Sequence, residues 1–177
     1  MYQPAEDSYF LLEILKSQLK AENKNIKILD IGSGTGILAS SCLALGFKNI
    51  TALDIDSETI KYLKSKFKNK IKIIKSDLFS QVNEKLNLIV FNPPYLPENK
   101  FDKKEDTTSG KKGCELIIKF LKQAKNHLKK NGKIILLFSS FSNPEKILEQ
   151  ARNLKYNYQL LAEKSLFFEK LFIYEFS

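Results

Sequence analysis

The short stretch Asn92-Pro93-Pro94-Tyr95 combines groups that could hold and orient a planar NH2 group. The side-chain oxygen of Asn92 and the backbone carbonyl of Pro93 can accept hydrogen bonds from its two hydrogens. Fixing both N–H bonds of an amide or base amine draws the delocalised lone pair out of conjugation and directs it at an electrophile. Pro94 keeps the loop rigid, and the ring of Tyr95 can lie against the flat group. This stretch therefore predicts a reaction at a weakly nucleophilic nitrogen.

A glycine-rich loop earlier in the chain is typical of a nucleotide-type site. Gly32, Gly34 and Gly36 follow an apolar run and precede a helical segment, so the backbone can approach a ligand near a helix N-terminus. The dinucleotide fingerprint requires G-x-G-x-x-G, and Gly36 comes one position too early for it. Asp54 ends the next apolar run, where a carboxylate suits the two vicinal hydroxyls of a ribose. The pattern predicts a ribose-containing ligand that is not a dinucleotide.

After residues 92–95, the glycine loop and Asp54, a fourth motif is formed by residues 76–79, which follow another apolar run and include Asp77 and Leu78. A polar side chain followed by an apolar one could bind the edge of an adenine ring and cover its face. Each motif alone has a structural alternative: Asp54 could be a helix-capping acid, although Asp56 and Ser57 are better placed for that role, and residues 92–95 could be a proline-rich strand exit. Four motifs in order, each after an apolar run, are a stronger signal than any one of them.

The segments that must position these motifs alternate between strands and helices. Apolar runs predict strands at 26–31, 49–55, 71–75, 86–91 and 133–139, and two more within 158–176. Helical periodicity predicts helices at 4–20, 35–45, 57–67 and 113–130, and a further one from about residue 144. Buried strands that alternate with helices predict an α/β fold with a parallel sheet, whose ligands bind at the carboxyl ends of the strands. The four motifs should therefore meet at one edge of the sheet.

Local signals predict where three of these helices begin or end. Pro4 is expected at the first position of the first helix, and Ser57 is expected to cap the helix at 57–67. Asn131-Gly132, preceded by lysines, is a typical stop signal and is expected to close the helix at 113–130.

The composition is that of one globular domain over residues 1–177, without a linker, repeat or compositional break. A hydrophobic content of 43% excludes disorder, and no apolar run approaches the roughly 18 residues of a spanning helix. The acidic start is unlike a signal peptide, and Cys42 and Cys114 lack the spacing of zinc ligands, so both are expected to be packed residues. We expect a cytoplasmic protein with no metal site and no membrane contact.

The formal net charge of +9 comes almost entirely from lysine, because Arg152 is the only arginine. Phosphate and base recognition favours the planar fork of arginine. Lysines alternate with asparagine and isoleucine, which fits a solvated surface as well as a phosphate-binding one. The charge therefore leaves nucleic-acid chemistry open without favouring it.

Together the four motifs resemble those of the Rossmann-like S-adenosylmethionine methyltransferases, in the branch that methylates amino groups. YQPAEDS at residues 2–8 is similar to the Y-x-P-A-E-D-[ST] opening of the HemK2/Mtq2 group. That group comprises the eukaryotic and archaeal glutamine methyltransferases of class-1 translation release factors. The resemblance runs over nearly the whole chain. It implies a seven-stranded sheet in the order 3-2-1-4-5-7-6, with the last strand antiparallel and helices on both faces.

The resemblance also implies a set of residues that bind the cofactor, S-adenosylmethionine, and the target. Those expected at the methionine and ribose parts are Ser8, Asp30, Gly32, Gly34, Gly36 and Asp54. Those expected at the adenine are Asp77 and Leu78. Asn92 is expected to touch both cofactor and target, within a catalytic loop formed by Asn92, Pro93, Pro94 and Tyr95. The N-terminal helix, about residues 4–20, is expected to cover the cofactor site.

The implied reaction moves a methyl group to the side-chain amide nitrogen of a protein glutamine and leaves S-adenosylhomocysteine. The implied target is the Gly-Gly-Gln motif of a class-1 release factor. The main alternative is an exocyclic amine of DNA or RNA, adenine N6 or guanine N2, although the chain shows no separate nucleic-acid-binding motif. A third alternative is a non-catalytic methyltransferase-like adaptor, which the presence of both Asn92 and Asp54 disfavours.

Two segments are relevant to partners and substrate docking, and one histidine has to be considered as a catalytic base. Members of the group often work with a small zinc-binding activator, Trm112, that adds a strand beside the third strand of the sheet. Residues 71–75 would form that edge, although their lysines could equally protect the edge of a monomer. The charged segment 96–112 is shorter than the corresponding loop of relatives. His127, near the end of a predicted helix, is expected to be structural rather than a catalytic base.

Overall fold

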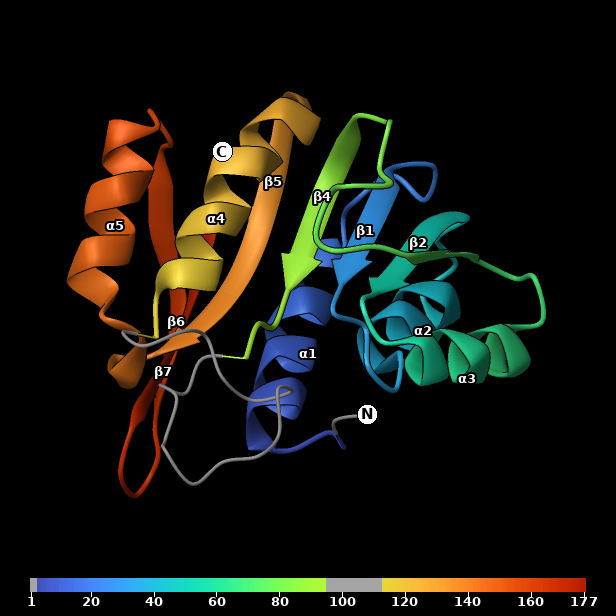
Figure 1. The fold of residues 1–177 in the computed structure, drawn as a ribbon, viewed down its shortest axis with the longest axis horizontal. Coiled ribbons are helices and arrows are strands. Elements are labelled where there is room, and N and C mark those ends of the chain that lie inside the picture. Colours follow the sequence, from blue (N-terminus) through green and yellow to red (C-terminus); the bar gives the residue numbers. More distant parts are fainter. Residues whose placement is uncertain (1–2, 95–112) are drawn as a thin grey trace.

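The computed structural model describes residues 3–94 and 113–177, and its seven strands form one sheet with helices on both faces (Figure 1). The strands are β1 (Lys27–Ile31), β2 (Asn49–Asp54), β3 (Lys72–Lys75), β4 (Leu86–Phe91), β5 (Leu128–Ser139), β6 (Tyr158–Ser165) and β7 (Lys170–Phe176). Their order is 3-2-1-4-5-7-6. The five neighbouring strands β3, β2, β1, β4 and β5 are parallel to one another, and β7 is antiparallel to both of its neighbours, β5 and β6. The predicted order and the antiparallel last strand are confirmed.

Two layers of helices enclose the sheet and bury a hydrophobic core on each face. The helices are α1 (Glu6–Leu19), α2 (Ile37–Ala44), α3 (Ser57–Phe67), α4 (Glu115–Ala124) and α5 (Pro144–Asn153), with short 3-10 turns η1 (Lys125–His127) and η2 (Ser140–Ser142). Figure 1 shows α4 and α5 in front of the sheet and α1 behind it. Along β1, Leu29 packs in the core with α4 and α5, whereas Ile28 packs in the core with α1, α2 and α3. Burial on both faces explains why the central strands read as continuous apolar runs.

The strand register brings the carboxyl ends of the first four strands together. Ile31, the last residue of β1, pairs with Leu53 of β2 and with Phe91 of β4. On the far side of β2, Asp54 pairs with Lys75, the last residue of β3. The motifs that follow these strands therefore begin at one edge of the sheet, as predicted.

The helix predicted at 113–130 is wrong beyond its middle, because α4 ends at Ala124 and β5 begins at Leu128. Leu128 pairs with Leu86 at the start of β4, and a shift in register follows within β5. Asn131, with φ 63°, lies in this bulge. A Cβ on Gly132 would lie 2.8 Å from the carbonyl oxygen of Leu86. The Asn-Gly pair thus serves a strand bulge against β4 and not a helix end.

The predicted caps also differ from the observed ones, and β5 begins five residues before its predicted start at 133, whereas the remaining boundaries agree within two residues. Helix α1 begins at Glu6 with Ala5 as its N-cap, so Pro4 precedes the helix. At α3 the cap is Asp56, whose carboxylate accepts from the backbone N–H and the hydroxyl of Thr59 at 2.8 and 2.7 Å. These bonds hold the pKa of Asp56 below its usual value. Ser57 is the first helical residue instead.

Candidate functional site

The glycine loop after β1 is fixed by backbone hydrogen bonds to the neighbouring strand end. Ser33 donates its backbone N–H to the carbonyl oxygen of Leu53 at 3.0 Å, and the N–H of Gly36 closes a turn onto Ser33 at 2.7 Å. Gly36 has φ 71° and precedes α2. A Cβ there would lie 2.8 Å from side-chain carbons of both Leu63 and Phe67, so α3 packs against the loop where only glycine fits. The loop is thereby held rigidly at the edge of the sheet.

Asp54 binds the glycine loop directly from the end of β2. Its Oδ2 accepts from the backbone N–H of Gly34 and its Oδ1 from the backbone N–H of Asp56, both at 3.0 Å. Each carboxylate oxygen keeps lone-pair capacity for a further donor, as two ribose hydroxyls would require. The next side chain, Ile55, is 65% exposed and offers an apolar surface beside this carboxylate. Sequence reasoning missed Ile55, because an isoleucine at a strand end gives no signal that it will be exposed.

Asp30, the last polar residue within β1, is a buried carboxylate with one unsatisfied oxygen. The side chain is 2% exposed, and its Oδ2 accepts from the backbone N–H of Ala39 in α2 at 3.2 Å. Its Oδ1 is buried and has no hydrogen-bond partner within residues 3–94 and 113–177. Burial, with a smaller contribution from the charge of Asp54, raises the pKa of Asp30 to about 7. Such a group is expected to bind a cation or a hydrogen-bond donor.

Asn92 follows β4 and is held by the first turn of α1. Its Nδ2 donates to Oδ2 of Asp7 at 2.8 Å, and the hydroxyl of Ser8 donates to Oδ1 of Asp7 at 3.3 Å. Oδ1 of Asn92 is buried and has no hydrogen-bond partner among the described residues. Of the loop that follows, Pro93 is buried and Pro94 half-buried, and Tyr95 lies outside the described residues. The structure thus brings Ser8 and Asn92 together through Asp7, which the sequence analysis included only as part of the YQPAEDS opening.

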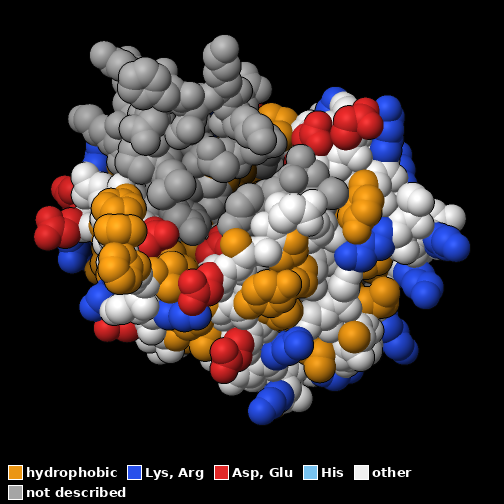
Figure 2. Space-filling view, turned by 90° about the horizontal axis from the view of Figure 1, so that it is seen from below, with side chains coloured by type: hydrophobic (Ala, Val, Ile, Leu, Met, Phe, Trp, Pro, Cys, Tyr) orange, Lys and Arg blue, Asp and Glu red, His pale blue; other side chains and the backbone are white. Residues whose placement is uncertain are grey.

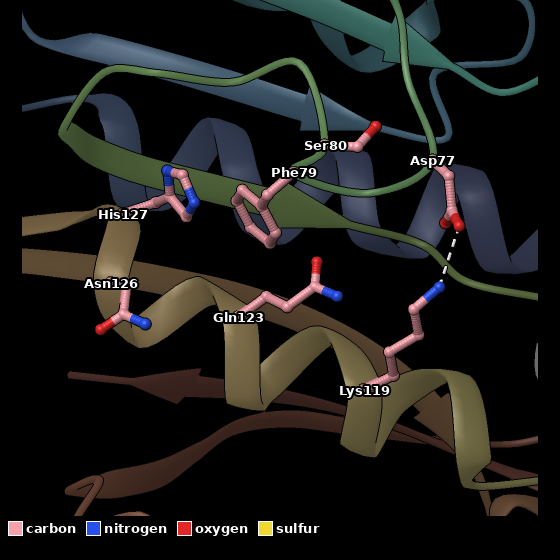
Figure 3. Close-up of a pocket in the computed structure, with 7 residues that line it drawn as sticks. All are labelled: Asp77, Phe79, Ser80, Lys119, Gln123, Asn126 and His127. Carbon is pink, nitrogen blue, oxygen red and sulfur yellow. Dashed lines mark hydrogen bonds and ion pairs between the residues drawn. The ribbon is translucent and has the colours of Figure 1, made fainter.

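The motif after β3 turns back along the front face of the sheet, toward α4. The carboxylate of Asp77 accepts from Nζ of Lys119 in α4 at 2.9 Å, with both side chains about half exposed (Figure 3). Leu78 has φ 45° and is 5% exposed, packed in the core on this face. The hydroxyl of Ser76 donates to the carbonyl oxygen of Leu78 at 2.8 Å and holds the turn. An adenine contact through Asp77 and Leu78 stays a prediction.

A pocket on the front face extends from Asp77 to His127, and His127 lies near the amino end of β4 (Figure 3). This pocket of about 340 Å³ is lined by Asp77, Phe79, Ser80, Lys119, Gln123, Asn126 and His127 (Figure 3). The His127 ring stacks on Phe79 with centroids 4.5 Å apart. His127 directly precedes Leu128, which pairs with Leu86 at the start of β4, whereas Asn92 follows the end of β4. The six residues of β4 span roughly 20 Å and therefore separate His127 from Asn92. This placement agrees with a structural role for His127.

Both cysteines are packed in the interior, as expected from the sequence. Cys42 is 1% exposed and Cys114 is fully buried. Burial raises the pKa of the Cys42 thiol to about 12, so it remains protonated at neutral pH. Neither cysteine has the character of a nucleophile.

Comparison with known proteins assigns these features to a family. The model of the methyltransferase small domain matches residues 6–167. A protein of Methanocaldococcus jannaschii, named as a candidate protein N5-glutamine methyltransferase, is 35% identical over 98% of this chain and 89% of its own length. The release factor glutamine methyltransferase of Borreliella burgdorferi is 32% identical over 75% of this chain, which spans 51% of that protein.

A solved structure has the same fold over nearly the full length of both chains. It is the E. cuniculi Mtq2-Trm112 complex, described as responsible for methylation of the translation termination factor eRF1. The match has a TM-score of 0.80 at 21% identity and covers 99% of this chain and 97% of that chain. At this identity the likeness shows the fold.

Proposed function

The chain belongs to the methyltransferase small domain family, and we propose that it methylates the side-chain amide nitrogen of a protein glutamine. The proposed target is the Gly-Gly-Gln motif of a class-1 translation release factor. The names of the archaeal and bacterial relatives support glutamine as the acceptor, and the bacterial name supports the release factor. S-adenosylmethionine is the cofactor: its methyl group would pass to the amide nitrogen as the sulfonium S–CH3 bond breaks, the nitrogen would release one proton to water, and S-adenosylhomocysteine would leave.

The residues at the strand ends fit this cofactor. It carries an ammonium group and two ribose hydroxyls, and the site offers the unsatisfied Oδ1 of Asp30 and the carboxylate of Asp54, held beside the glycine loop. The exposed Ile55 gives an apolar surface next to the proposed ribose position. The residues that we propose to hold the cofactor are Ser8, Asp30, Gly32, Gly34, Gly36, Asp54, Asp77, Leu78 and Asn92.

The observation that carries the proposal is the hydrogen bonding of the Asn92 side-chain amide. Its NH2 group is bound to Asp7, while its buried oxygen has no partner within the described ranges. That oxygen can accept one N–H of a target NH2 group, and the carbonyl of Pro93 can accept the other. The two bonds would align the target nitrogen and strengthen as positive charge develops on it during its attack on the methyl group. Pro94 and Tyr95 complete the proposed catalytic loop.

The described side chains around this site do not form a basic patch. Figure 2 views the carboxyl ends of the parallel strands, and the described side chains across its middle are mainly hydrophobic, acidic or uncharged, with lysines gathered toward its margins. Binding to the phosphates of DNA or RNA requires clustered positive charge. This distribution supports a protein target over a base amine.

A labelling experiment tests the proposal. The protein is incubated with radiolabelled S-adenosylmethionine and, in separate reactions, the cognate release factor, RNA and DNA. We expect one methyl group on the release factor and none on the nucleic acids. A release factor whose Gly-Gly-Gln glutamine is changed to Asn should stay unlabelled, because the shorter amide no longer reaches Asn92. Label on adenine or guanine, with none on the release factor, would establish the base-amine alternative.

We also propose a partner at the outer edge of the sheet, a small zinc-binding activator of the Trm112 type. Within the described residues β3 pairs on one side only, with β2. Ile73 and Ile74 in this edge strand are half-buried. Lys72 forms an ion pair with Glu84 at 3.3 Å, and this pair offsets part of the positive charge along the edge strand. An added strand would bury the free backbone groups of β3.

Co-expression with the cognate activator, followed by gel filtration, tests this partner. We expect a single peak that contains both chains, and separate elution would support a monomer. A matched pair of variants sharpens the result. Ile73→Pro removes a backbone N–H from the edge strand and should weaken any strand pairing that uses it, whereas Lys72→Ala keeps the backbone and should still allow the complex.

The organisation and location of the protein remain part of the proposal. In the parts of the chain that the structure describes, no helix is long and apolar enough to cross a membrane. We propose that residues 1–177 act as one domain, that α1 covers the bound cofactor, and that the protein works in the cytoplasm with its release-factor substrate.

A further inference from the structure

Asp7 is a buried carboxylate that contacts the proposed catalytic loop from a distant part of the sequence. It lies in the first turn of α1, is 4% exposed, and binds Asn92, 85 residues away along the chain. We propose that Asp7 is a positioning residue that fixes the orientation of the Asn92 side-chain amide. This inference rests on the proposed function, because it concerns the oxygen that receives the target NH2 group.

The burial of Asp7 is not explained by packing. Asp7, Leu11, Leu15 and Leu19 recur every four residues and form the buried stripe of α1. An apolar residue at position 7 would continue this stripe without the cost of burying a carboxylate. The first-turn position reduces that cost, since the helix N-terminus favours negative charge. The hydrogen bond from Asn92 offsets part of the remaining cost, which packing alone would not do.

The chemistry of the contact decides which end of the amide faces Asp7. A carboxylate accepts hydrogen bonds and does not donate them, so only the NH2 end of Asn92 can face its Oδ2 at 2.8 Å. The hydroxyl of Ser8 donates to the other carboxylate oxygen at 3.3 Å. Rotating the amide by half a turn would place two oxygens against each other. Asp7 therefore favours one orientation of the two that an asparagine can adopt.

The favoured orientation is the one that the proposed reaction needs. With its nitrogen bound to Asp7, Asn92 presents Oδ1, which is buried and has no partner in the described part of the chain, as an acceptor. In the reversed orientation Asn92 would present an NH2 group to the NH2 group of the target, and neither could accept. Asp7 acts on the target only through Asn92, so its loss should lower turnover and leave cofactor affinity unchanged.

An isosteric variant tests this inference. Asp7→Asn keeps the size of the side chain, but its own NH2 group can bind the oxygen of Asn92 and permit the reversed orientation. We expect kcat to fall about ten- to hundredfold with the affinity for S-adenosylmethionine within about twofold of the wild type. Glu6→Gln is the matched control, because Glu6 is the adjacent first-turn acid, is exposed, and pairs with Lys164 at 2.8 Å. It should leave kcat unchanged.

A double-variant cycle separates positioning from general damage to the fold. In an Asn92→Ala background the Asp7→Asn change should lower kcat no further than about twofold, since the group through which Asp7 acts is gone. Effects that multiply in the double variant would overturn the inference, as would an unchanged kcat in Asp7→Asn alone. The assay uses whichever acceptor the wild-type protein labels. If that acceptor is an oligonucleotide, the proposed function fails, while the cycle still tests Asp7.

A second measurement requires no acceptor. In NMR spectra of the ¹⁵N-labelled protein, the side-chain NH2 signals of Asn92 are identified by their absence in Asn92→Ala. A hydrogen bond to a buried carboxylate should protect them from exchange with water in the wild type and in Glu6→Gln. The protection should be lost in Asp7→Ala. Equal protection in Asp7→Ala would show that Asp7 does not hold the amide.

Discussion

At the carboxyl end of β4, Asn92 keeps a buried oxygen with no hydrogen-bond partner in the residues that the structure describes, whereas near the amino end the side-chain oxygen of Asn87 accepts from the backbone N–H of Lys27 and from Nζ of Lys129. There the ring of His127 stacks on Phe79, and Nζ of Lys85 donates to the carbonyl oxygen of Asn126 at 2.6 Å. Histidine is the more usual catalytic residue type. The comparison teaches that the unsatisfied acceptors of Asn92 and Asp30 mark the site because they also belong to the strand-end motifs, whereas Oε2 of Glu169, equally buried and without a partner among the described residues, lies outside it.

The same contrast extends to β1, where Asp30 also keeps an unsatisfied buried oxygen at the carboxyl edge. Asp30 and Asn92 lie near the ends of neighbouring strands, since Ile31 pairs with Phe91. A cofactor bound to one and a target bound to the other would therefore be adjacent. Changes at the carboxyl end should alter binding or turnover, and changes at the amino end should alter stability alone.

The largest effect is expected from Asn92→Ala. Because the bond to its oxygen strengthens as positive charge develops on the target nitrogen in the transition state, the rate of methyl transfer should fall roughly 10²–10³-fold. The affinity for S-adenosylmethionine should change far less. Single-turnover kinetics and calorimetry measure the two quantities. A variant that transfers methyl groups at the wild-type rate would remove Asn92 from the catalytic loop.

Asp54→Ala should affect the cofactor and not the transfer step. The loss of hydrogen bonds from two ribose hydroxyls to a carboxylate should weaken S-adenosylmethionine binding by about 1.5–3 kcal/mol. Isothermal titration calorimetry measures this difference. Asp56→Ala is the matched control, because Asp56 caps α3 two residues later and should alter helix stability with little change in affinity. Unchanged affinity in Asp54→Ala would place the ribose elsewhere.

Asp30 should make cofactor binding depend on pH. Burial raises its pKa to about 7, so below that pH the free protein holds a neutral carboxyl group. A bound ammonium group favours the ionised form, so binding should release a proton at lower pH, and affinity should rise up to about tenfold from about pH 6 to about pH 7.5. Calorimetry in buffers of different ionisation enthalpy detects the proton. Asp30→Asn should abolish both effects.

The same pKa has the opposite consequence for stability without cofactor. Since the folded protein binds a proton that the unfolded chain releases near its usual pKa of 3.8, the free energy of unfolding should fall as pH rises toward about 7. Denaturant unfolding across this range should show the decline in the wild type and a smaller decline in Asp30→Asn. An equal slope in both proteins would contradict the raised pKa.

The smallest effect on function is expected from His127→Ala at the amino end. The loss of stacking on Phe79 should lower the free energy of unfolding by about 0.5–1.5 kcal/mol. Methyl transfer should stay within about twofold of the wild type, since the length of β4 separates this ring from Asn92. Denaturant unfolding and the labelling assay provide the two measurements. A large loss of transfer in a folded variant would make the two ends of β4 functionally alike.

Much of the fold could be predicted from the sequence because its signals are local and agree with one another. Strand 86–91 and helix 57–67 were predicted to the residue, because the apolar residues that mark them in the sequence are the residues that the fold buries. The order of the sheet came from the resemblance carried by the motifs. The helix expected at 113–130 failed because Asn131-Gly132 suits a helix end and a strand bulge equally well. Only pairing with β4 distinguishes the two.

For the candidate site, the sequence by itself determined which residue types follow which strands, and hence the glycine loop, Asp54 and Asn92 at one edge of a parallel sheet. The tertiary structure alone decided that Asp7 binds Asn92, that Asp30 keeps an unsatisfied oxygen, and that Ile55 is exposed. The physical reason is the separation along the sequence of the residues that decide each feature. A strand end is set by neighbours along the chain, whereas a hydrogen bond across 85 residues depends on how α1 packs behind the sheet.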